Sequence, residues 1–347
     1  MRVMVAMSGG VDSSVAAALL RDEGHDVVGV TLKLWGGESD TGCCSVSDVD
    51  DARRVAQQLG IDHHVFNFGD EFARHVVGPY VEAHAAGRTP NPCIECNRHL
   101  KFDRLLDRAD ALGFDAVATG HHARIVQKAD GSRRVARGAD AEKDQSYVLH
   151  MLDQHQLART VLPVGTMTKA DVRHAAADLG LRTATKPDSQ DVCFITSSAG
   201  RAGFLAERLD LHDGVVVDRD DREVGRVDAV ELVTVGQRKG LGVSGSGERR
   251  FAVSVDVPRR RVVVGREADL DCDATPLDDL AWVAGAVTDE VLVQTSAHGL
   301  PSRARVDGDG DVDAPEVRWS APHRRVAAGQ SVVLYLGDEV VGSGIAR

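Results

Sequence analysis

A loop close to the N-terminus combines residue types that could hold an anion. Residues 8–14 read Ser-Gly-Gly-Val-Asp-Ser-Ser and lie between an apolar run at 2–7 and a segment of helical composition at 13–21. Two glycines let the backbone come close to a phosphate, while hydroxyls and a helix N-terminus supply donors and a positive dipole end. The loop lacks the Gly-Lys-Ser/Thr ending of an ordinary P-loop. We therefore predict a phosphate-binding loop of another class.

A pair of cysteines forms the second chemical signal. Cys93 and Cys96 follow the stretch Pro-Asn-Pro at 90–92, and the two prolines predict an extended approach to a helix that begins near Asn97. A thiol beside such a helix N-terminus is favoured as the thiolate, its nucleophilic form. The alternative is a structural zinc half-site, although the chain offers no second Cys-x-x-Cys pair to complete four ligands.

Two further thiols differ in their surroundings. Cys193 lies within KPDSQDVCFI at 186–195, beside acidic and polar residues, although the VCFI segment alone would pass for core. Cys272 is predicted to be a small buried hydrophobe. A secreted disulfide framework is not expected in a chain of 347 residues that starts without the features of a secretion signal.

The first half of the chain must position these groups, and its pattern alternates between strand and helix. Such alternation is typical of a parallel sheet covered by helices on both faces, and such folds bind nucleotides directly after a strand. The expected strands are 2–7, 26–33, 63–68 and 115–119, and the expected helices are 13–21, 47–59, 71–86 and 100–112.

The second half changes to short β-branched segments separated by Gly, Pro and Asp clusters, which is typical of small barrels or sandwiches. The expected strands are 215–218, 251–256, 262–265, 291–295, 302–306, 316–319 and 331–336. We expect an α/β fold, with an N-terminal parallel-sheet, Rossmann-like domain followed by two small β-rich domains. The expected boundaries give domains at 1–199, 200–270 and 271–347.

Composition limits the class of protein. The chain is 43% hydrophobic, and no apolar run approaches the roughly 20 residues that a membrane-spanning helix needs. We expect a cytoplasmic protein with no membrane partner. The net charge of -12 disfavours nucleic acid at first sight. Positive charge is nevertheless clustered at 124–143, at 249–266 and at Arg318, Arg324 and Arg325. Salt screening limits the distance over which charges interact to about 8–10 Å, so acidic residues farther away do not cancel these clusters. Such clusters predict RNA phosphate contacts with a steep salt dependence.

The residues at 8–14 resemble the PP-loop of ATP pyrophosphatases, and the chain as a whole resembles the tRNA-specific 2-thiouridylases (the MnmA/TrmU family). Seven segments in the family's order carry the resemblance: SGGVDSS, GCCS at 42–45, GRTPNPCIECN at 87–97, ATGHHAR at 118–124, KDQSYVL at 143–149, KPDSQDVCFI and GQRKGLG at 236–242. This order along nearly the whole chain makes coincidence a poor explanation.

The resemblance implies a two-stage reaction on uridine 34, the wobble base of certain tRNAs. ATP, with Mg²⁺, adenylates the C2 oxygen, because a urea-like carbonyl is a poor electrophile until its oxygen becomes a leaving group. Sulfur from a protein persulfide then gives 2-thiouridine. The family implies that Cys193 carries the persulfide and that Cys96 is the partner nucleophile, with a Cys96–Cys193 disulfide as one outcome. A cysteine desulfurase or sulfur-relay protein is the implied donor.

Further roles follow from the resemblance, residue by residue. The implied ATP-binding residues are Ala6, Met7, Ser8, Gly9, Gly10, Val11, Asp12, Ser13, Leu32 and Gly120. The residues implied to approach the target base are Asn91, Pro92 and Cys93, and those implied to contact tRNA are Lys143, Asp144 and Gln145.

The sequence departs from the family pattern at two places. Many relatives carry Asp where Cys93 stands, so Cys93 is open to roles as a base, a spare thiol or a metal ligand. Cys93, Cys96 and Cys193 could also supply three ligands to a [4Fe-4S] cluster with one open iron site. In the C-terminal domain, an Arg-aromatic pair of relatives aligns near Ser296 and Ala297, which leaves tRNA contact there open.

Two other classes of function compete with this interpretation. A PP-loop ligase that forms an amide on a small molecule would explain the loop at 8–14 but would leave Cys96, Cys193 and the β-rich half without a role. A non-catalytic, ATP-dependent RNA-binding or sulfur-carrier module would bind tRNA without turning over ATP.

Overall fold

The structure, a computed structural model, describes residues 1–35, 46–188, 192–195, 200–243, 249–308 and 315–347. Cys43, Cys44 and residues 189–191 of the predicted segments lie outside this part. The chain divides into two compact units, the first made of residues 1–77, 92–198 and 338–340 and the second of residues 78–91, 199–337 and 341–347. The division into three domains at 199 and 270 stays a prediction.

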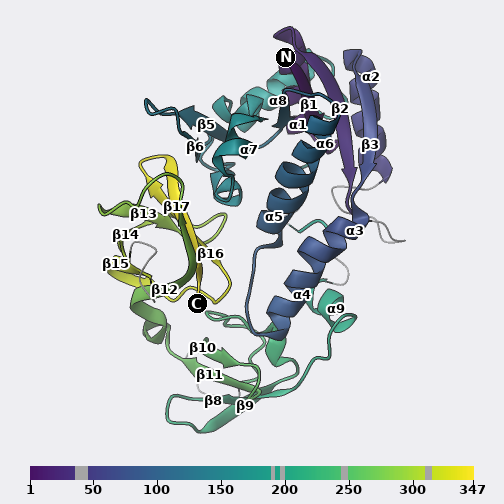
Figure 1. Cartoon of the computed structure of the whole chain (residues 1–347). Coiled ribbons are helices and arrows are strands. Elements are labelled where there is room, and N and C mark those ends of the chain that lie inside the picture. The colour runs from purple at the N-terminus through teal and green to yellow at the C-terminus, as the bar shows by residue number, and fades with distance from the viewer. Residues whose placement is uncertain (36–45, 189–191, 196–199, 244–248, 309–314) are drawn as a thin grey trace. The chain divides into compact units, whose positions relative to one another are not determined.

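The first unit is built on a parallel five-stranded sheet (Figure 1). Its strand order is β3 (Asp62–Asn67), β2 (Asp26–Lys33), β1 (Arg2–Ala6), β4 (Ala116–Thr119) and β7 (Thr160–Val161). Every neighbouring pair in it is parallel. Since the carboxyl ends of parallel strands meet at one edge, the loop after β1 and the residues after β4 come to the same edge of the sheet.

Helices cover this sheet because their apolar residues recur on one face. α1 (Val11–Asp22), α2 (Val46–Leu59) and α8 (Lys169–Asp178) bury Val15, Val55 and Val172 in one cluster with Val3 and Val5 of β1. This rigid layer holds the N-terminus of α1 directly behind the loop after β1. Further helices of this unit are α3 (Gly69–Phe72), η1 (Ala73–Val77), η3 (Ser146–Leu149), α7 (Gln154–Ala158) and η4 (Pro163–Thr166).

The cysteine pair lies on a helix that begins earlier than predicted. α5 (Pro92–Glu95), η2 (Cys96–Arg104) and α6 (Leu105–Ala111) follow one another without a break. The prediction that the helix begins near Asn97, with Cys96 at its N-terminus, is therefore wrong, and Cys93 occupies the first turn instead. Proline is tolerated in a first turn because its missing N–H would have no partner there in any case, so Pro92 opens the helix rather than delaying it.

A hairpin of the first unit was not predicted. β5 (Ala123–Gln127) and β6 (Arg133–Arg137) pair antiparallel, and Glu339 pairs with Ala136. Their many arginines hide the alternation of a strand in the sequence.

The second unit contains two β-rich parts. One is a sheet in the order β10 (Phe251–Asp256), β11 (Arg261–Gly265), β8 (Gly214–Val217) and β9 (Glu223–Val227), packed around Val216, Val230 and Val262. The helices of this unit are α4 (Gly78–Ala85), α9 (Gly200–Ala206), η5 (Val230–Leu232) and η6 (Glu267–Leu270).

The other β-rich part closes on itself. Its strands run in the order β12 (Asp271–Trp282), β15 (Glu316–Arg324), β14 (Ser302–Asp307), β13 (Val291–Gln294), β16 (Ser331–Leu336) and β17 (Glu339–Ala346), and β17 pairs again with β12. The acidic stretch after 270, expected to be a boundary, is thus a strand whose Thr275 and Leu277 are buried while its aspartates face outward. The predicted fold class is confirmed.

Candidate functional site

The loop after β1 is held open by its own hydrogen bonds. Ser8 N–H donates to Ser13 Oγ over 3.2 Å, and the hydroxyls of Ser13 and Ser14 donate to the carbonyl of Gly10 over 3.2 and 2.8 Å. Gly10 caps α1 with its backbone alone, since no side chain caps this helix. The first amides of α1 therefore keep their capacity to bind an anion.

Two glycines allow backbone segments to approach this loop closely. Gly9 has a φ of +72°, and a Cβ there would lie 2.2 Å from the carbonyl oxygen of Asp48. A Cβ on Gly120 would lie 2.5 Å from the nitrogen of Ser13. The predicted loop residues and Gly120 are thus brought together at one edge of the sheet.

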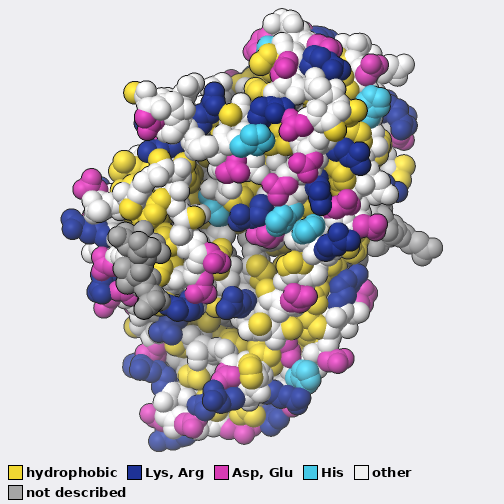
Figure 2. All heavy atoms as spheres, viewed as in Figure 1, with side chains coloured by type: hydrophobic (Ala, Val, Ile, Leu, Met, Phe, Trp, Pro, Cys, Tyr) yellow, Lys and Arg dark blue, Asp and Glu magenta, His cyan; other side chains and the backbone are white. Residues whose placement is uncertain are grey.

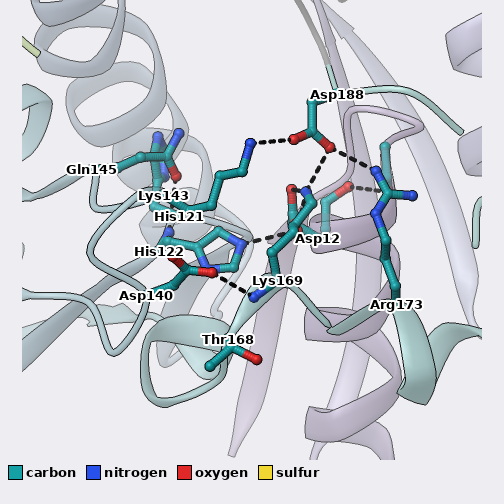
Figure 3. A network of polar contacts seen from close by, with 12 residues as sticks. Asp12, His121, His122, Asp140, Lys143, Gln145, Thr168, Lys169, Arg173 and Asp188 are labelled. Carbon is teal, nitrogen blue, oxygen red and sulfur yellow. Dashed lines mark hydrogen bonds and ion pairs between the residues drawn. The ribbon is translucent and has the colours of Figure 1, made fainter. Parts of the chain in front are cut away.

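Asp12 is the centre of a polar network at this edge (Figure 3). Lys169 Nζ donates to both carboxylate oxygens of Asp12 over 2.8 and 2.7 Å, and His122 Nε2 lies 3.0 Å from Oδ1. Burial by itself would raise the pKa of Asp12, but the hydrogen bonds from His122 and Lys169 outweigh it and lower the pKa below the usual value. Asp12 is therefore ionised and fixed in position.

Three cationic side chains contact Asp188, which lies beside Asp12. Lys143 Nζ donates to Oδ2 over 2.8 Å, while Lys169 Nζ and Arg173 Nη2 each lie 2.9 Å from Oδ1 (Figure 3). Burial would raise the pKa of Asp188, but hydrogen bonds from Lys143 and Lys169 hold that pKa well below its usual range. The pKa of Lys143 is raised in turn by its hydrogen bond to Asp188.

A further lysine approaches the loop from its other side. Lys186 Nζ donates to the carbonyl of Gly9 over 3.0 Å and to the carboxylates of Asp48 and Asp51 over 2.6 and 2.7 Å. It links α2 to Gly9 of the loop.

The remaining predicted ATP-binding residues contribute chiefly main chain or packing. Met7, Val11 and Leu32 are buried, and the first two belong to the apolar cluster behind the sheet. Ala6 is the last residue of β1. The backbone at Met7 is held by Thr31, whose hydroxyl donates to the carbonyl of Met7 over 2.7 Å.

The residues predicted to contact tRNA differ in exposure and in their hydrogen-bond partners. The Lys143 side chain is 41% exposed. The Asp144 side chain is only 6% exposed, and its carboxylate accepts hydrogen bonds from Arg137, Ser146 and the N–H of Gly138. Gln145 accepts a hydrogen bond from the N–H of His122 over 2.9 Å. Lys143 therefore presents a cation, while Asp144 and Gln145 shape the turn that carries it.

Positive charge near this turn is largely balanced within the first unit. Arg124, Lys128 and Arg134 pair with Asp338 or Glu339. On the face drawn in Figure 2, Lys and Arg are interspersed with Asp and Glu. The predicted basic cluster at 124–143 is therefore a set of ion pairs more than a bare positive stripe.

The predicted thiols lie in the first unit, in different environments. Cys96 is buried, and Cys93 and Cys193 are partly exposed. Phe194, directly after Cys193, packs against Phe72 with ring centroids 5.6 Å apart and against Trp35 at 6.3 Å. This aromatic cluster anchors the backbone beside Cys193. Pro92 is buried at the start of α5, and Asn91 precedes it.

Metal ligands do not converge in the described part of the chain. Among those residues, no group of three or more His, Cys, Asp or Glu side chains is placed to hold a metal ion. As they lie here, Cys93, Cys96 and Cys193 do not fit an iron–sulfur cluster, and the Cys96–Cys193 disulfide stays a prediction. Cys272, predicted to be buried, is partly exposed and donates to the carbonyl of His323.

Sequence reasoning missed the residues that complete the network. Lys169 and Arg173 stand far from the loop along the chain, and only folding brings them to it. Lys186 opens the segment KPDSQDVCFI, which was singled out above for Cys193 and not for this lysine. One local signal was present, since Thr168 and Asp171 form a capping box that places Lys169 at the first position of α8. His122 lies within the segment ATGHHAR at 118–124, and it contacts Asp12.

No described helix is long and apolar enough to span a bilayer.

Family models match the chain in three consecutive segments. They are described as a tRNA methyl transferase HUP domain at residues 1–197, a tRNA methyl transferase PRC-barrel domain at 202–266 and an aminomethyltransferase beta-barrel domain at 273–346.

Full-length relatives give the family. The tRNA-specific 2-thiouridylase MnmA of Chloroflexus aurantiacus is 47% identical, covering 99% of this chain and 98% of the relative. The enzyme of the same name from Heliobacterium modesticaldum is 46% identical, with 99% and 91% covered. A solved NMN synthetase from Francisella tularensis has a TM-score of only 0.35 at 17% identity, covering 54% of this chain and 66% of that one. The family assignment therefore depends on the sequence relatives, and by them the chain belongs to the tRNA-specific 2-thiouridylases.

Proposed function

We propose that the protein is a tRNA-uridine 2-sulfurtransferase that converts uridine 34 to 2-thiouridine, using ATP and a protein persulfide, in the cytoplasm. The observation that carries this proposal is similarity to 2-thiouridylases along 99% of the chain. The polar network around the loop after β1 supports it, because the open N-terminus of α1 and the lysines beside it suit a triphosphate.

In the first stage, the C2 oxygen of the uracil attacks the α-phosphorus of ATP, and pyrophosphate leaves. The loop from Ser8 to Ser13 would hold the phosphates, and Gly120 leaves room for the nucleotide against α1. Mg²⁺, when bound, neutralises phosphate charge, and it commonly takes only one or two carboxylates from the protein. Asp12, ionised at the loop, is the carboxylate that fits such a role.

In the second stage, sulfur replaces the adenylated oxygen. In one route the terminal sulfur of the Cys193 persulfide attacks C2, and the Cys96 thiolate then attacks Cys193 Sγ, which breaks the sulfur–sulfur bond and frees the thiolated base. In the other route the Cys96 thiolate attacks Cys193 Sγ first and releases hydrosulfide, which attacks C2. AMP leaves in both cases, and both routes end in a Cys96–Cys193 disulfide that an external thiol must reduce before the next turnover. A cysteine desulfurase or a relay protein would reload Cys193.

One assay tests the proposal. The protein is incubated anaerobically with ATP, Mg²⁺, a persulfide donor and unmodified tRNA, and the nucleosides are analysed by mass spectrometry. We expect 2-thiouridine, AMP and pyrophosphate from the wild type and none of the thiolated base from Cys193→Ser. Cys272→Ser, in the closed barrel, is the matched control and should keep thiolation.

Two results would overturn the proposal. ATP cleavage that depends on a small amine acceptor would indicate an amide-forming ligase, and tRNA binding without any ATP cleavage would indicate a binding module. Iron analysis after anaerobic purification tests the cluster separately.

A further inference from the structure

The segment that leads to the predicted base-binding residues has few donors of its own. Residues 88–92 include Pro90 and Pro92, which have no N–H to donate. The N–H of Arg88 closes the helix before this segment by donating to the carbonyl of Ala83 over 2.8 Å. The backbone groups that follow must therefore be bound by other parts of the chain if the segment is to keep one conformation.

Both main-chain groups of Thr89 are bound by the C-terminal barrel, the closed sheet made of β12 to β17. The N–H of Thr89 donates to the carbonyl of Ala328 over 2.8 Å, and its carbonyl accepts from the side-chain amide of Gln330. Thr89 stands only two residues before Asn91 along the chain. The barrel therefore fixes the chain directly before the predicted base-binding residues.

The barrel loop that makes these contacts lies between β15 and β16, and it is anchored on its other side. The N–H of Gly329 donates to the carbonyl of Ala346 over 2.8 Å, and the N–H of Ala346 donates to the carbonyl of Gln330 over 2.9 Å. Gly329 has a φ of +87°, and a Cβ there would lie 3.0 Å from the Cβ of Arg88 and 3.2 Å from the nitrogen of Thr89. The loop and the segment are therefore so close that a residue larger than glycine would displace one of them.

The other β-rich part of the second unit contacts the same residue. Thr234 Oγ1 lies 3.4 Å from Thr89 Oγ1, and Thr234 stands just before the segment GQRKGLG at 236–242, which the proposed reaction does not use. Gln237 of that segment holds Thr234, since its Oε1 accepts from the N–H of Thr234 over 3.1 Å and its own N–H donates to the carbonyl of Thr234 over 2.9 Å. Both β-rich parts therefore contact Thr89.

We propose that the C-terminal barrel positions Asn91 for the target uridine, with Gln330 as the positioning residue that acts through Thr89. This inference rests on the proposed function, because it requires that residues 91–93 approach the base. The C2 oxygen of the uracil must lie in line with the α-phosphorus of ATP, and a displacement of about 1 Å can lower such a rate about a hundredfold. The β-rich half of the chain thus contributes to the rate of thiolation through the backbone of one segment.

Single-turnover thiolation tests this proposal. Protein loaded with persulfide is mixed anaerobically with Mg-ATP and a series of tRNA concentrations, and 2-thiouridine is measured against time. Gln330→Met removes the donor at nearly unchanged volume. We expect its maximum rate to fall about three- to tenfold, while the half-saturating tRNA concentration changes less than about twofold. The matched control is Gln58→Met, which removes a side-chain amide from the carbonyls of Leu179 and Gly180 in the first unit and should thiolate as the wild type does.

A second pair of variants separates positioning from a loss of stability. Gly329→Ala and Gly337→Ala both place alanine in the left-handed region, at φ values of +87° and +61°, but a Cβ at Gly337 meets nothing within 4 Å. We expect both variants to have a lower denaturant midpoint and only Gly329→Ala to slow thiolation. Binding of Mg-ATP, measured by calorimetry, should equal that of the wild type in all four variants, since the loop after β1 belongs to the other unit.

Three results would overturn the proposal. One is a wild-type maximum rate in both Gln330→Met and Gly329→Ala. Another is a higher half-saturating tRNA concentration at an unchanged maximum rate, which would make the segment a tRNA-binding element only. The third is equal slowing by Gly329→Ala and Gly337→Ala, which would indicate a general loss of stability. Wild-type protein that forms no 2-thiouridine would instead refute the proposed function.

Discussion

Lys143 donates a hydrogen bond to Asp188 over 2.8 Å, and this pair links the turn at 143–146 to the segment that leads to Cys193. Asp188 also accepts from Lys169, which holds Asp12 of the loop. Through Asp188, the residue expected to contact tRNA, Lys143, and a lysine beside the loop after β1, Lys169, therefore share one anion. Any ligand that draws Lys143 away changes the charge seen by Lys169.

Removal of this exposed lysine should weaken RNA binding more than it affects folding. We expect Lys143→Met to lower tRNA affinity and to reduce the slope of log affinity against log salt by about 1, as for one lost phosphate contact. The free energy of unfolding should fall by only about 0.2–1 kcal/mol, because the pair is partly exposed. Filter binding over a salt series measures the slope, and Lys128→Met is the control. An unchanged slope would exclude a phosphate contact.

Asp144 should matter for stability. Its buried carboxylate accepts hydrogen bonds from Arg137, Ser146 and the N–H of Gly138. Asp144→Ala therefore leaves these donors without this acceptor. The expected loss is about 1–3 kcal/mol in the free energy of unfolding, measured by denaturant titration. The exposed neighbour Glu142→Gln should unfold as the wild type does. Wild-type stability of Asp144→Ala would show that these hydrogen bonds do not stabilise the fold.

A glycine after β4 should tolerate no side chain. In Gly120→Ala the new Cβ meets the backbone of Ser13 at 2.5 Å, so α1 must move away from the strand ends. We expect a cost of about 1–3 kcal/mol and weaker ATP binding. A Cβ on Gly285 meets nothing within 4 Å, so Gly285→Ala is the control. Unimpaired ATP binding in Gly120→Ala would show that the nucleotide does not depend on this close approach.

His63 should make stability depend on pH. Its Nε2 lies 2.9 Å from Thr31 Oγ1, and burial, with the charges of Arg53 and His64, lowers its pKa from 6.5 to about 4. Between these values the unfolded chain binds the proton more readily, so stability is complete above pH 6.5 and declines as the pH falls towards about 4.

The variant that checks this is His63→Gln, which keeps a donor near the position of Nε2 but does not titrate. Its unfolding free energy should fall less than that of the wild type between about pH 7 and about pH 5, while His155→Gln, at an exposed position of α7, should follow the wild type. Parallel decline of His63→Gln and wild type would assign the pH dependence to other groups.

The sequence predicted the secondary-structure elements that have a local residue pattern. Residues 26–33, 251–256 and 331–336 are strands with the predicted bounds, because β-branched runs end there at turn residues. The strand from Asp271 was missed because its outward aspartates and Pro276 look like a linker, whereas in the fold its edge pairs with β15 and Leu277 packs into the apolar cluster. In the same way, the loop at 8–14 could be predicted from its local sequence. The contact of Lys169 with Asp12 could not, because it depends on tertiary packing.

Residues 338–340 belong to the first unit, although most of that unit is encoded before residue 199. Glu339 pairs with Ala136 in the hairpin and neutralises Lys128 and Arg134. On the ribosome, the N-terminal unit therefore emerges long before the residues that balance its hairpin have been translated. The ion pairs of Lys128 and Arg134 with Glu339 can form only after residues 199–337 of the second unit have been translated, so this hairpin is completed later than the rest of the first unit.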